Sequence, residues 1–198
     1  TRVFALGEVN QPGAYEIKST ATLFTSLYYF NGPSYNGSLR NIKLIRNNKE
    51  IATIDFYDYL LTGKKPRDEK LQLDDVVFIP KRSKTISIRG EINRPGIYEL
   101  DSMETLVDLI SIAGGLKVSA YLERAQIDRI VPFEERDTLG MDRMYRDVNL
   151  EEIINLNQVV ALKNQDEVVI YSILDMRQNV VEIFGAVTRP GRYDLGGG

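Results

Sequence analysis

The 198-residue sequence contains no cysteine, no histidine and no tryptophan. Without cysteine there are no disulfide bonds, and the redox compartment of the protein is left open. Without histidine, the side chain that serves most often as a general base or a metal ligand is missing. Any catalysis would have to use carboxylates, lysine or tyrosine, so the sequence favours a protein that is not an enzyme and has no cofactor.

The chain also lacks a net positive charge and long apolar runs. The formal net charge is −3, so the chain lacks the basic footprint of a nucleic-acid-binding protein. Its apolar runs are too short for a helix that spans a bilayer. The chain begins with Thr1 and shows no signal peptide or lipidation signal, and we therefore expect it to be a segment of a longer protein.

What the sequence does contain is a nine-residue motif in three copies. The copies are residues 7–15 (GEVNQPGAY), 90–98 (GEINRPGIY) and 185–193 (GAVTRPGRY). Proline favours a turn, and the glycine after it tolerates the positive φ of a type II turn or a bulged loop. Each copy therefore predicts a β-hairpin. A leading glycine within a strand indicates a bulge or the close approach of another backbone.

The copies divide into constant and variable positions. The constant positions, which we assign to a structural motif, are Gly7, Pro12, Gly13 and Tyr15, then Gly90, Pro95, Gly96 and Tyr98, then Gly185, Pro190, Gly191 and Tyr193. The recurring tyrosine predicts a structural role in covering the hairpin. The variable positions are candidates for contacts between domains or between chains, and they are Glu8, Gln11, Glu91, Arg94 and Arg189.

Self-similarity extends beyond the hairpins. At an offset of 83 positions Thr22-Leu23 aligns with Thr105-Leu106, and Arg46 aligns with Arg129. Further on, we align Asp74-Asp75 with Asp166-Glu167. Between these segments the second copy has an insertion at 131–145, whose charged composition predicts a surface location.

Each copy reads as a hairpin, a helix, a strand, a short helix and a strand. In the second copy apolar residues at helical spacing follow Ser102, which is a candidate N-cap, and Gly114-Gly115 ends the helix. In the first copy we expect a helix over 23–30. The other predicted elements are strands over 76–79, 125–130 and 168–170 and a short helix over 150–156.

This order predicts an α+β fold of tandem β-grasp domains, each a small mixed sheet with a packed helix. We expect domains at 1–82 and 83–176, followed at 177–198 by the truncated start of a third domain. For the last hairpin, 181–195, we expect packing on the second domain, pairing with another chain, or poor order, because an isolated hairpin is marginally stable in water.

Two residue types are candidates for chemistry or binding. Acidic pairs such as Asp74-Asp75 and Asp166-Glu167 are interpreted as solvated surface, since charge runs usually mark exposed faces. The tyrosines suit half-buried strands as well as protein or carbohydrate interfaces. Tyr35, in the polar loop 31–38, is the best candidate for an exposed aromatic ring that contacts a glycan.

The motif Gly-Glu-Val/Ile-Asn-x-Pro-Gly-x-Tyr followed by Thr-Leu and, in the second copy, by Ala113-Gly114-Gly115 resembles the soluble-ligand-binding β-grasp (SLBB) domain. The resemblance covers nearly the whole chain, and the first copy departs from it at Phe30-Asn31-Gly32. The tandem arrangement is similar to that of outer-membrane polysaccharide export proteins. That similarity implies a periplasmic, outer-membrane-associated, membrane-anchored parent that forms an oligomeric ring.

The resemblance to export proteins implies further partners: copies of the same chain, a capsular or extracellular polysaccharide, and the inner-membrane export machinery. It implies no catalytic residues. A rival interpretation is a small-ligand module, since SLBB domains are also predicted to bind cobalamin. An electron-transfer subunit is disfavoured because there is no cysteine for an iron–sulfur cluster.

Overall fold

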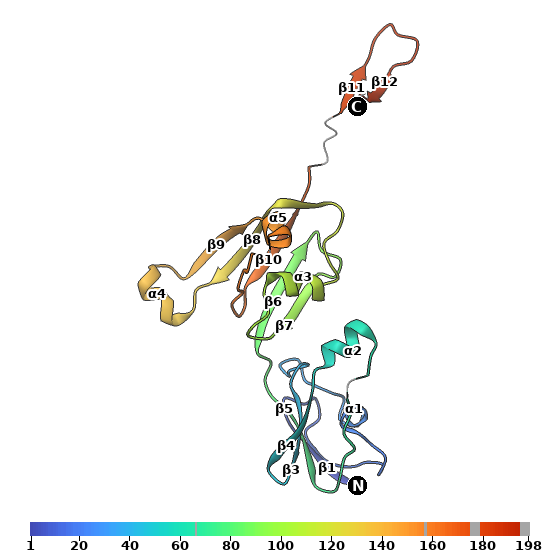
Figure 1. Ribbon diagram of the computed structural model, residues 1–198, viewed down its shortest axis with the longest axis vertical. Coiled ribbons are helices and arrows are strands. Elements are labelled where there is room, and N and C mark those ends of the chain that lie inside the picture. The colour runs from blue at the N-terminus through green and yellow to red at the C-terminus, as the bar shows by residue number, and fades with distance from the viewer. Residues whose placement is uncertain (66, 157, 175–178, 195–198) are drawn as a thin grey trace.

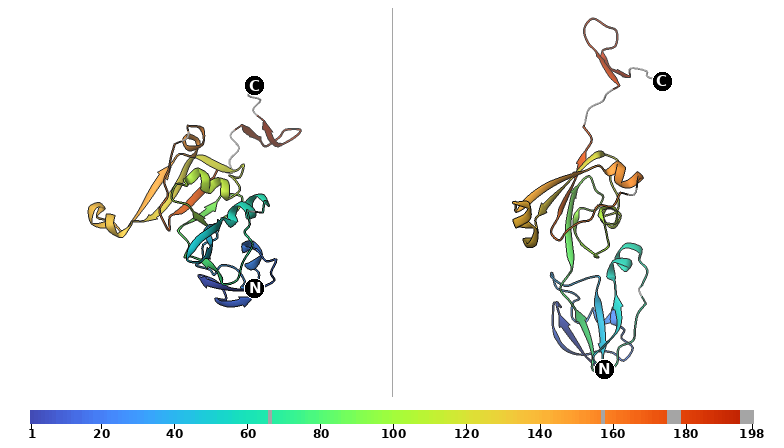
Figure 2. Two further views of the ribbon diagram at one scale, coloured as in Figure 1. Left: turned by 60° about the horizontal axis from the view of Figure 1, so that its bottom comes forward. Right: turned by 60° about the vertical axis from the view of Figure 1, so that its left-hand side comes forward.

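A computed structural model describes residues 1–65, 67–156, 158–174 and 179–194. Over these ranges the chain forms two five-stranded sheets and a two-stranded hairpin. The three parts follow one another along the long axis, with the N-terminus and the hairpin at opposite ends (Figure 1), and the other views agree (Figure 2). No helix in the described ranges is long and apolar enough to cross a membrane.

The first domain is built around a mixed sheet. Its elements are β1 (Arg2–Gly7), β2 (Gly13–Glu16), α1 (Leu23–Ser26), β3 (Ile42–Arg46), β4 (Lys49–Ile54), α2 (Phe56–Thr62) and β5 (Asp75–Ile79). The strand order is β2-β1-β5-β3-β4. The β1–β5 pair is parallel and the other neighbours are antiparallel.

The second domain repeats this topology. Its elements are β6 (Lys84–Gly90), β7 (Gly96–Leu100), α3 (Leu106–Ile112), β8 (Ala120–Ile130), α4 (Phe133–Leu139), β9 (Arg143–Val148), α5 (Leu150–Asn155) and β10 (Glu167–Ser172), with the order β7-β6-β10-β8-β9. A third hairpin consists of β11 (Val180–Ile183) and β12 (Gly191–Asp194). The predicted tandem α+β organisation is confirmed.

In each domain one face of the sheet is covered by the segment that follows the first hairpin. In the first domain Leu23 and Phe30 pack with strand residues such as Leu44. In the second, Leu106 and Leu109 of α3 occupy the same place. Alternate strand residues are buried, which is the pattern of a sheet with one core face.

The leading glycine of the first two motifs lies against the neighbouring strand, as predicted. Gly7 has φ +84°, and a Cβ there would lie 2.2 Å from the carbonyl oxygen of Ile79. Gly90 has φ +92°, and its Cβ would lie 2.0 Å from that of Ile170. Only glycine permits this approach with a left-handed backbone. At Gly185 a Cβ would meet nothing within 4 Å.

Two of the glycines after proline, Gly13 and Gly191, have positive φ as predicted, but not the value of a type II turn. The φ angle is 154° at Gly13 and 159° at Gly191, whereas the third position of a type II turn requires about +80°. These glycines instead begin the returning strands in a nearly extended conformation.

Two helix predictions are wrong in detail. The N-cap of α3 is Thr105, not Ser102, and its backbone N–H donates to the Asp108 carboxylate at 2.8 Å. In the first domain α1 ends at Ser26, well short of residue 30. The chain then continues in turns, and the N–H of Gly32 donates to the carbonyl oxygen of Leu27 at 2.8 Å.

The acidic pairs at the last strands were misaligned by one position and misinterpreted. Asp75 and Asp166 are 0% exposed, and each binds an arginine through two nitrogens. The closest contacts are 2.7 Å from Arg46 to Asp75 and 2.6 Å from Arg129 to Asp166. Asp75 therefore corresponds to Asp166. Such bidentate pairing is what allows a carboxylate to be buried.

Apart from the buried Val131, the insertion 131–145 lies at the surface, and part of it is a helix that the sequence did not predict. None of the residues of α4 is buried. The helix joins β8 to β9 and lies at the far tip of that hairpin, away from the sheets (Figure 1). In the first domain the same connection is only the tight turn Asn47-Asn48, in which both residues have positive φ.

Candidate functional site

The two domains meet in a polar network centred on the carboxylate of Glu99, which is 5% exposed. From the first domain it accepts hydrogen bonds from the hydroxyl of Ser38 at 2.8 Å and the N–H of Leu39 at 3.0 Å. From the linking segment it accepts the N–H of Ser83 at 3.0 Å and its hydroxyl at 3.3 Å. These donors compensate the cost of removing the charge from water.

Tyr57 is a residue of the first domain that packs into the second. It lies on α2, yet the residue is 8% exposed and packs in the hydrophobic core of the second domain. Its hydroxyl accepts the backbone N–H of Glu99 at 2.7 Å. Burial raises the pKa of the Tyr57 phenol. The N-cap residue Asp55, which accepts the Tyr57 N–H at 2.8 Å, fixes the start of the helix.

Arg40 bridges the same junction from the first domain. Its guanidinium pairs with Asp55 at 3.0 Å and with Glu104 of the second domain, and it lies 4.9 Å from the ring centroid of Tyr57. It also donates to the carbonyl oxygen of Glu99 at 3.3 Å. Burial lowers the pKa of Arg40, but the hydrogen bonds with Glu104 and Asp55 outweigh burial and raise it.

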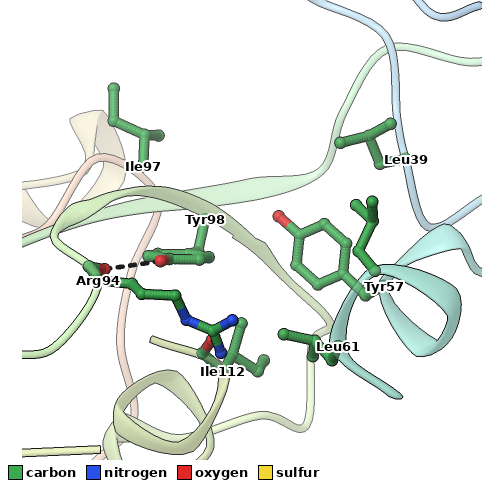
Figure 3. A pocket seen from close by; sticks show the side chains of 8 residues that line it. Leu39, Tyr57, Leu61, Arg94, Ile97, Tyr98 and Ile112 are labelled. Carbon is green, nitrogen blue, oxygen red and sulfur yellow. Dashed lines mark hydrogen bonds between the residues drawn. The ribbon is translucent and has the colours of Figure 1, made fainter. Parts of the chain in front are cut away.

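Beside this network lies an apolar cleft of about 290 Å³ (Figure 3). Its lining comes from both domains and consists of Leu39, Tyr57, Leu60, Leu61, Arg94, Ile97, Tyr98 and Ile112. The guanidinium of Arg94 lies at the Ile112 side, where Nη2 donates to the Ile112 carbonyl oxygen at 3.0 Å. The cleft therefore combines aliphatic and aromatic walls with one cation.

A second cavity, of about 430 Å³, is polar. It is lined by Ser38, Arg40, Asn41, Lys81, Ser83, Glu99, Asp101 and Ser102. The junction thus has an apolar recess and a polar recess that share no lining residue. Among the residues that the structure describes, no three potential metal-ligating side chains gather to hold an ion.

The variable hairpin residues have different surroundings. Glu8 accepts the hydroxyl of Ser34 at 3.0 Å, and Glu91 accepts that of Ser119 at 2.5 Å. Each glutamate thus ties its hairpin to a loop of its own domain. Arg94 lines the cleft between domains. Gln11 and Arg189 are exposed.

The recurring tyrosines clamp the loops of their hairpins. The hydroxyls of Tyr15, Tyr98 and Tyr193 donate to the carbonyl oxygens of Gln11, Arg94 and Arg189, each at 2.6 Å. Because the backbone carbonyl is the acceptor, the side chain at the position before proline is free to differ between copies.

The second hairpin also binds the end of α3. The side-chain amide of Asn93 donates to the carbonyl oxygen of Gly114 at 2.8 Å, and the N–H of Asn93 donates to that of Gly115 at 3.0 Å. Both glycines have φ +85°. Asn10 makes the corresponding bond to the carbonyl oxygen of Asn31 at 2.7 Å in the first domain, so Asn31 takes the place of Gly114.

Tyr35, the glycan-contact candidate, is 77% exposed. The guanidinium of Arg82 lies 4.8 Å from its ring centroid, which is within the range of a cation–π contact. The ring is therefore held in place while much of it stays open to solvent.

Sequence reasoning missed Arg40, Tyr57 and Glu99. One signal was available, because the counterparts of Arg40 and Tyr57 in the second copy are acidic, Glu123 and Glu151. A change from arginine and tyrosine to glutamate marks these two positions as specific to the first copy.

Two mixed five-stranded sheets with packed helices define a tandem β-grasp protein. The chain belongs to the SLBB domain family, whose model matches residues 2–55 and 85–146, together more than half of the sequence. This is a ligand-binding family rather than a catalytic one. No curated protein matches the chain.

Proposed function

We propose that this chain is a non-catalytic segment of a polysaccharide export protein, periplasmic and associated with the outer membrane through a membrane-anchored parent. Copies of it assemble into the wall of a conduit for a capsular or extracellular polysaccharide, next to the inner-membrane export machinery. The observation that carries this proposal is the junction at Glu99, which joins two SLBB domains into one elongated unit.

The physical reason is stiffness. A conduit wall needs units that keep their shape while a polymer passes, and a flexible linker between two small domains would not provide this. The buried Tyr57 ring and the Glu99 and Arg40 hydrogen bonds resist both rotation and separation of the domains. Breaking them would leave buried charged groups without partners, which is costly.

Glycan contact is the second part of the proposal. A conduit must release what it binds, so its contacts with sugar should be individually weak. Tyr35 offers an exposed aromatic ring, on which sugar rings stack. The polar cavity offers serine, asparagine, lysine and aspartate side chains that suit sugar hydroxyls.

The export role is tested in the cells that make this protein. Replacing Arg40 and Glu99 together by alanine in the full-length protein should reduce extracellular polysaccharide while the protein still accumulates. The matched control replaces the exposed ion pair Arg2–Asp74, which lies within one domain, and should leave export unchanged. Export that continues undiminished when the whole gene is removed would refute the proposed role.

Glycan contact is tested separately by NMR titration with the polysaccharide those cells produce. Tyr35→Ala should reduce the shift changes, whereas Tyr28→Ala should not, although Tyr28 is 88% exposed. If both variants lost the shift changes equally, or if the unaltered chain showed none, glycan contact at Tyr35 would be refuted. The proposed role in the conduit wall would then stand alone.

A further inference from the structure

We infer that the apolar cleft between α2 and the β6–β7 hairpin binds a small amphipathic anion, an alkyl or aryl body that carries one carboxylate. This site is distinct from any contact with sugar, and the inference does not depend on the proposed role in export. It rests on the lining of the cleft, on the state of its polar groups and on its size (Figure 3).

The walls of the cleft are apolar and still accessible. Leu60 is 56% exposed, Leu61 is 40% exposed, and Ile97 on the opposite side is 57% exposed. A ligand body placed between them would remove apolar surface from water on both sides, worth about 25 cal/mol for each Å². Pockets with such walls are common where two domains meet.

Each tyrosine hydroxyl at the cleft makes one hydrogen bond within the protein. Tyr57 accepts the N–H of Glu99, and Tyr98 donates to the carbonyl oxygen of Arg94. Each hydroxyl therefore already has one partner, and what the two tyrosines add to the walls of the cleft is mainly the apolar surface of their rings. The five aliphatic side chains of the lining offer no hydrogen-bond partners, so sugar hydroxyls that faced them would be left unpaired, at a cost for each one. The lining thus selects an apolar body over a polyol.

Arg94 supplies the charge preference. One of its N–H groups is used by the Ile112 carbonyl oxygen. Within the described ranges no carboxylate pairs with it at ion-pair distance. Guanidinium carries five N–H donors in a planar fork, so groups remain for an incoming carboxylate. A carboxylate is therefore the head group that best complements the cation of the cleft.

The size of the cleft limits the body. A volume of about 290 Å³ lies at the lower end of the range for drug-sized ligands. It suits a single aromatic ring or a short alkyl chain. A corrin ring system is much larger, so this cleft does not accommodate the cobalamin-like ligand of the rival interpretation.

The test compares two probes of equal shape, 4-phenylbutyrate and its neutral amide 4-phenylbutyramide, by NMR titration of the protein. Both should shift the signals of Leu60, Leu61 and Ile97. The carboxylate should bind about two- to fivefold tighter, the range expected for a solvent-accessible ion pair. Equal affinities, or shifts confined to other parts of the chain, would overturn the inference. So would the absence of any shift at millimolar probe.

Three variants test whether Arg94 is the source of the preference for the carboxylate probe. Arg94→Gln introduces the residue found at the same place in the first hairpin, Gln11, and should abolish the preference for the carboxylate while weak apolar binding remains. Arg189→Gln makes the same change in the third hairpin and should alter nothing. Leu61→Gln should weaken both probes equally. The comparison of probes on the unaltered chain needs no variant, so a variant that misfolds does not rescue the inference.

Discussion

The first and second domains share every strand pairing but differ at the tip of one hairpin and at one end of the domain. At the tip, the Asn47-Asn48 turn of the first domain is replaced by α4 in the second. The register of β8 and β9 is nevertheless continuous over six pairs. The difference teaches that the frame is determined by the sheet and its core, while the tip tolerates an insertion.

The difference at the end of the domain concerns what each domain offers to its C-terminal neighbour. The first domain offers Arg40 and Tyr57, which bind the second domain. The second has Glu123 and Glu151 at these places, and the third hairpin lies apart from it (Figure 1). Two domains with the same topology therefore differ in whether they bind the part that follows them, and a few side chains account for the difference.

The largest expected effect tests the shared frame. Asp166→Ala leaves Arg129 buried without its carboxylate, which should cost the second domain about 3–5 kcal/mol. Asp75→Ala should cost the first domain less, because the Arg46 side chain is 21% exposed and Arg129 is 10% exposed. Urea unfolding followed by NMR signals of each domain measures both. Equal costs would show that exposure of the arginine does not matter.

A second prediction concerns the leading glycines. Gly90→Ala should destabilise the second domain by about 1–3 kcal/mol, since alanine needs a strained φ and its Cβ would meet the Ile170 carbonyl oxygen. Gly185→Ala is the matched control, with a similar φ but open space around it. Its effect on the unfolding midpoint of either domain should be negligible. A comparable loss from both variants would contradict the close-approach explanation.

The smallest expected effect concerns the junction and its pH dependence. Tyr57→Phe removes the acceptor of the Glu99 N–H and should cost about 0.5–1.5 kcal/mol. The raised pKa of Tyr57 means that, as pH rises above about 10, the unfolded chain ionises first and the folded chain later. Stability should therefore fall with rising pH in that window, as read from chemical unfolding at each pH.

The same substitution separates Tyr57 from the other tyrosines. In the variant produced by Tyr57→Phe, the alkaline decline in stability should be shallower than in the unaltered chain, because the group with the raised pKa is gone. Parallel declines in the two proteins would assign the pH dependence to other groups.

Local patterns predicted much of the fold. The three hairpins, the helix α3 and the strands β5 and β10 follow from apolar periodicity and from the positions of proline and glycine. These signals act over a few residues. The N-cap of α3 was misassigned because Ser102 and Thr105 both suit a cap, and only the contact with Asp108 decides between them. The helix in the insertion was missed because its composition is that of exposed surface.

The junction was beyond local patterns. Glu99 sits in a strand, and nothing in its neighbourhood reveals that donors from Ser38 and Ser83 converge on it. The alignment of Asp166 with Asp74 instead of Asp75 has the same cause. An ion pair between distant segments, such as Arg129 and Asp166, has no local signature in the sequence. Such contacts depend on how separate elements come together in space.

The position of Tyr57 shows that the domain boundary in the sequence and the domain boundary in the packing do not coincide. By chain order the ring belongs to the first domain, but by packing it is a core residue of the second. A second domain cut out at residue 83 would therefore lack the Tyr57 ring and have a cavity of that size in its core. Anyone who isolates or exchanges these domains should carry α2 along with its downstream neighbour, since the cooperative unit begins before the repeat does.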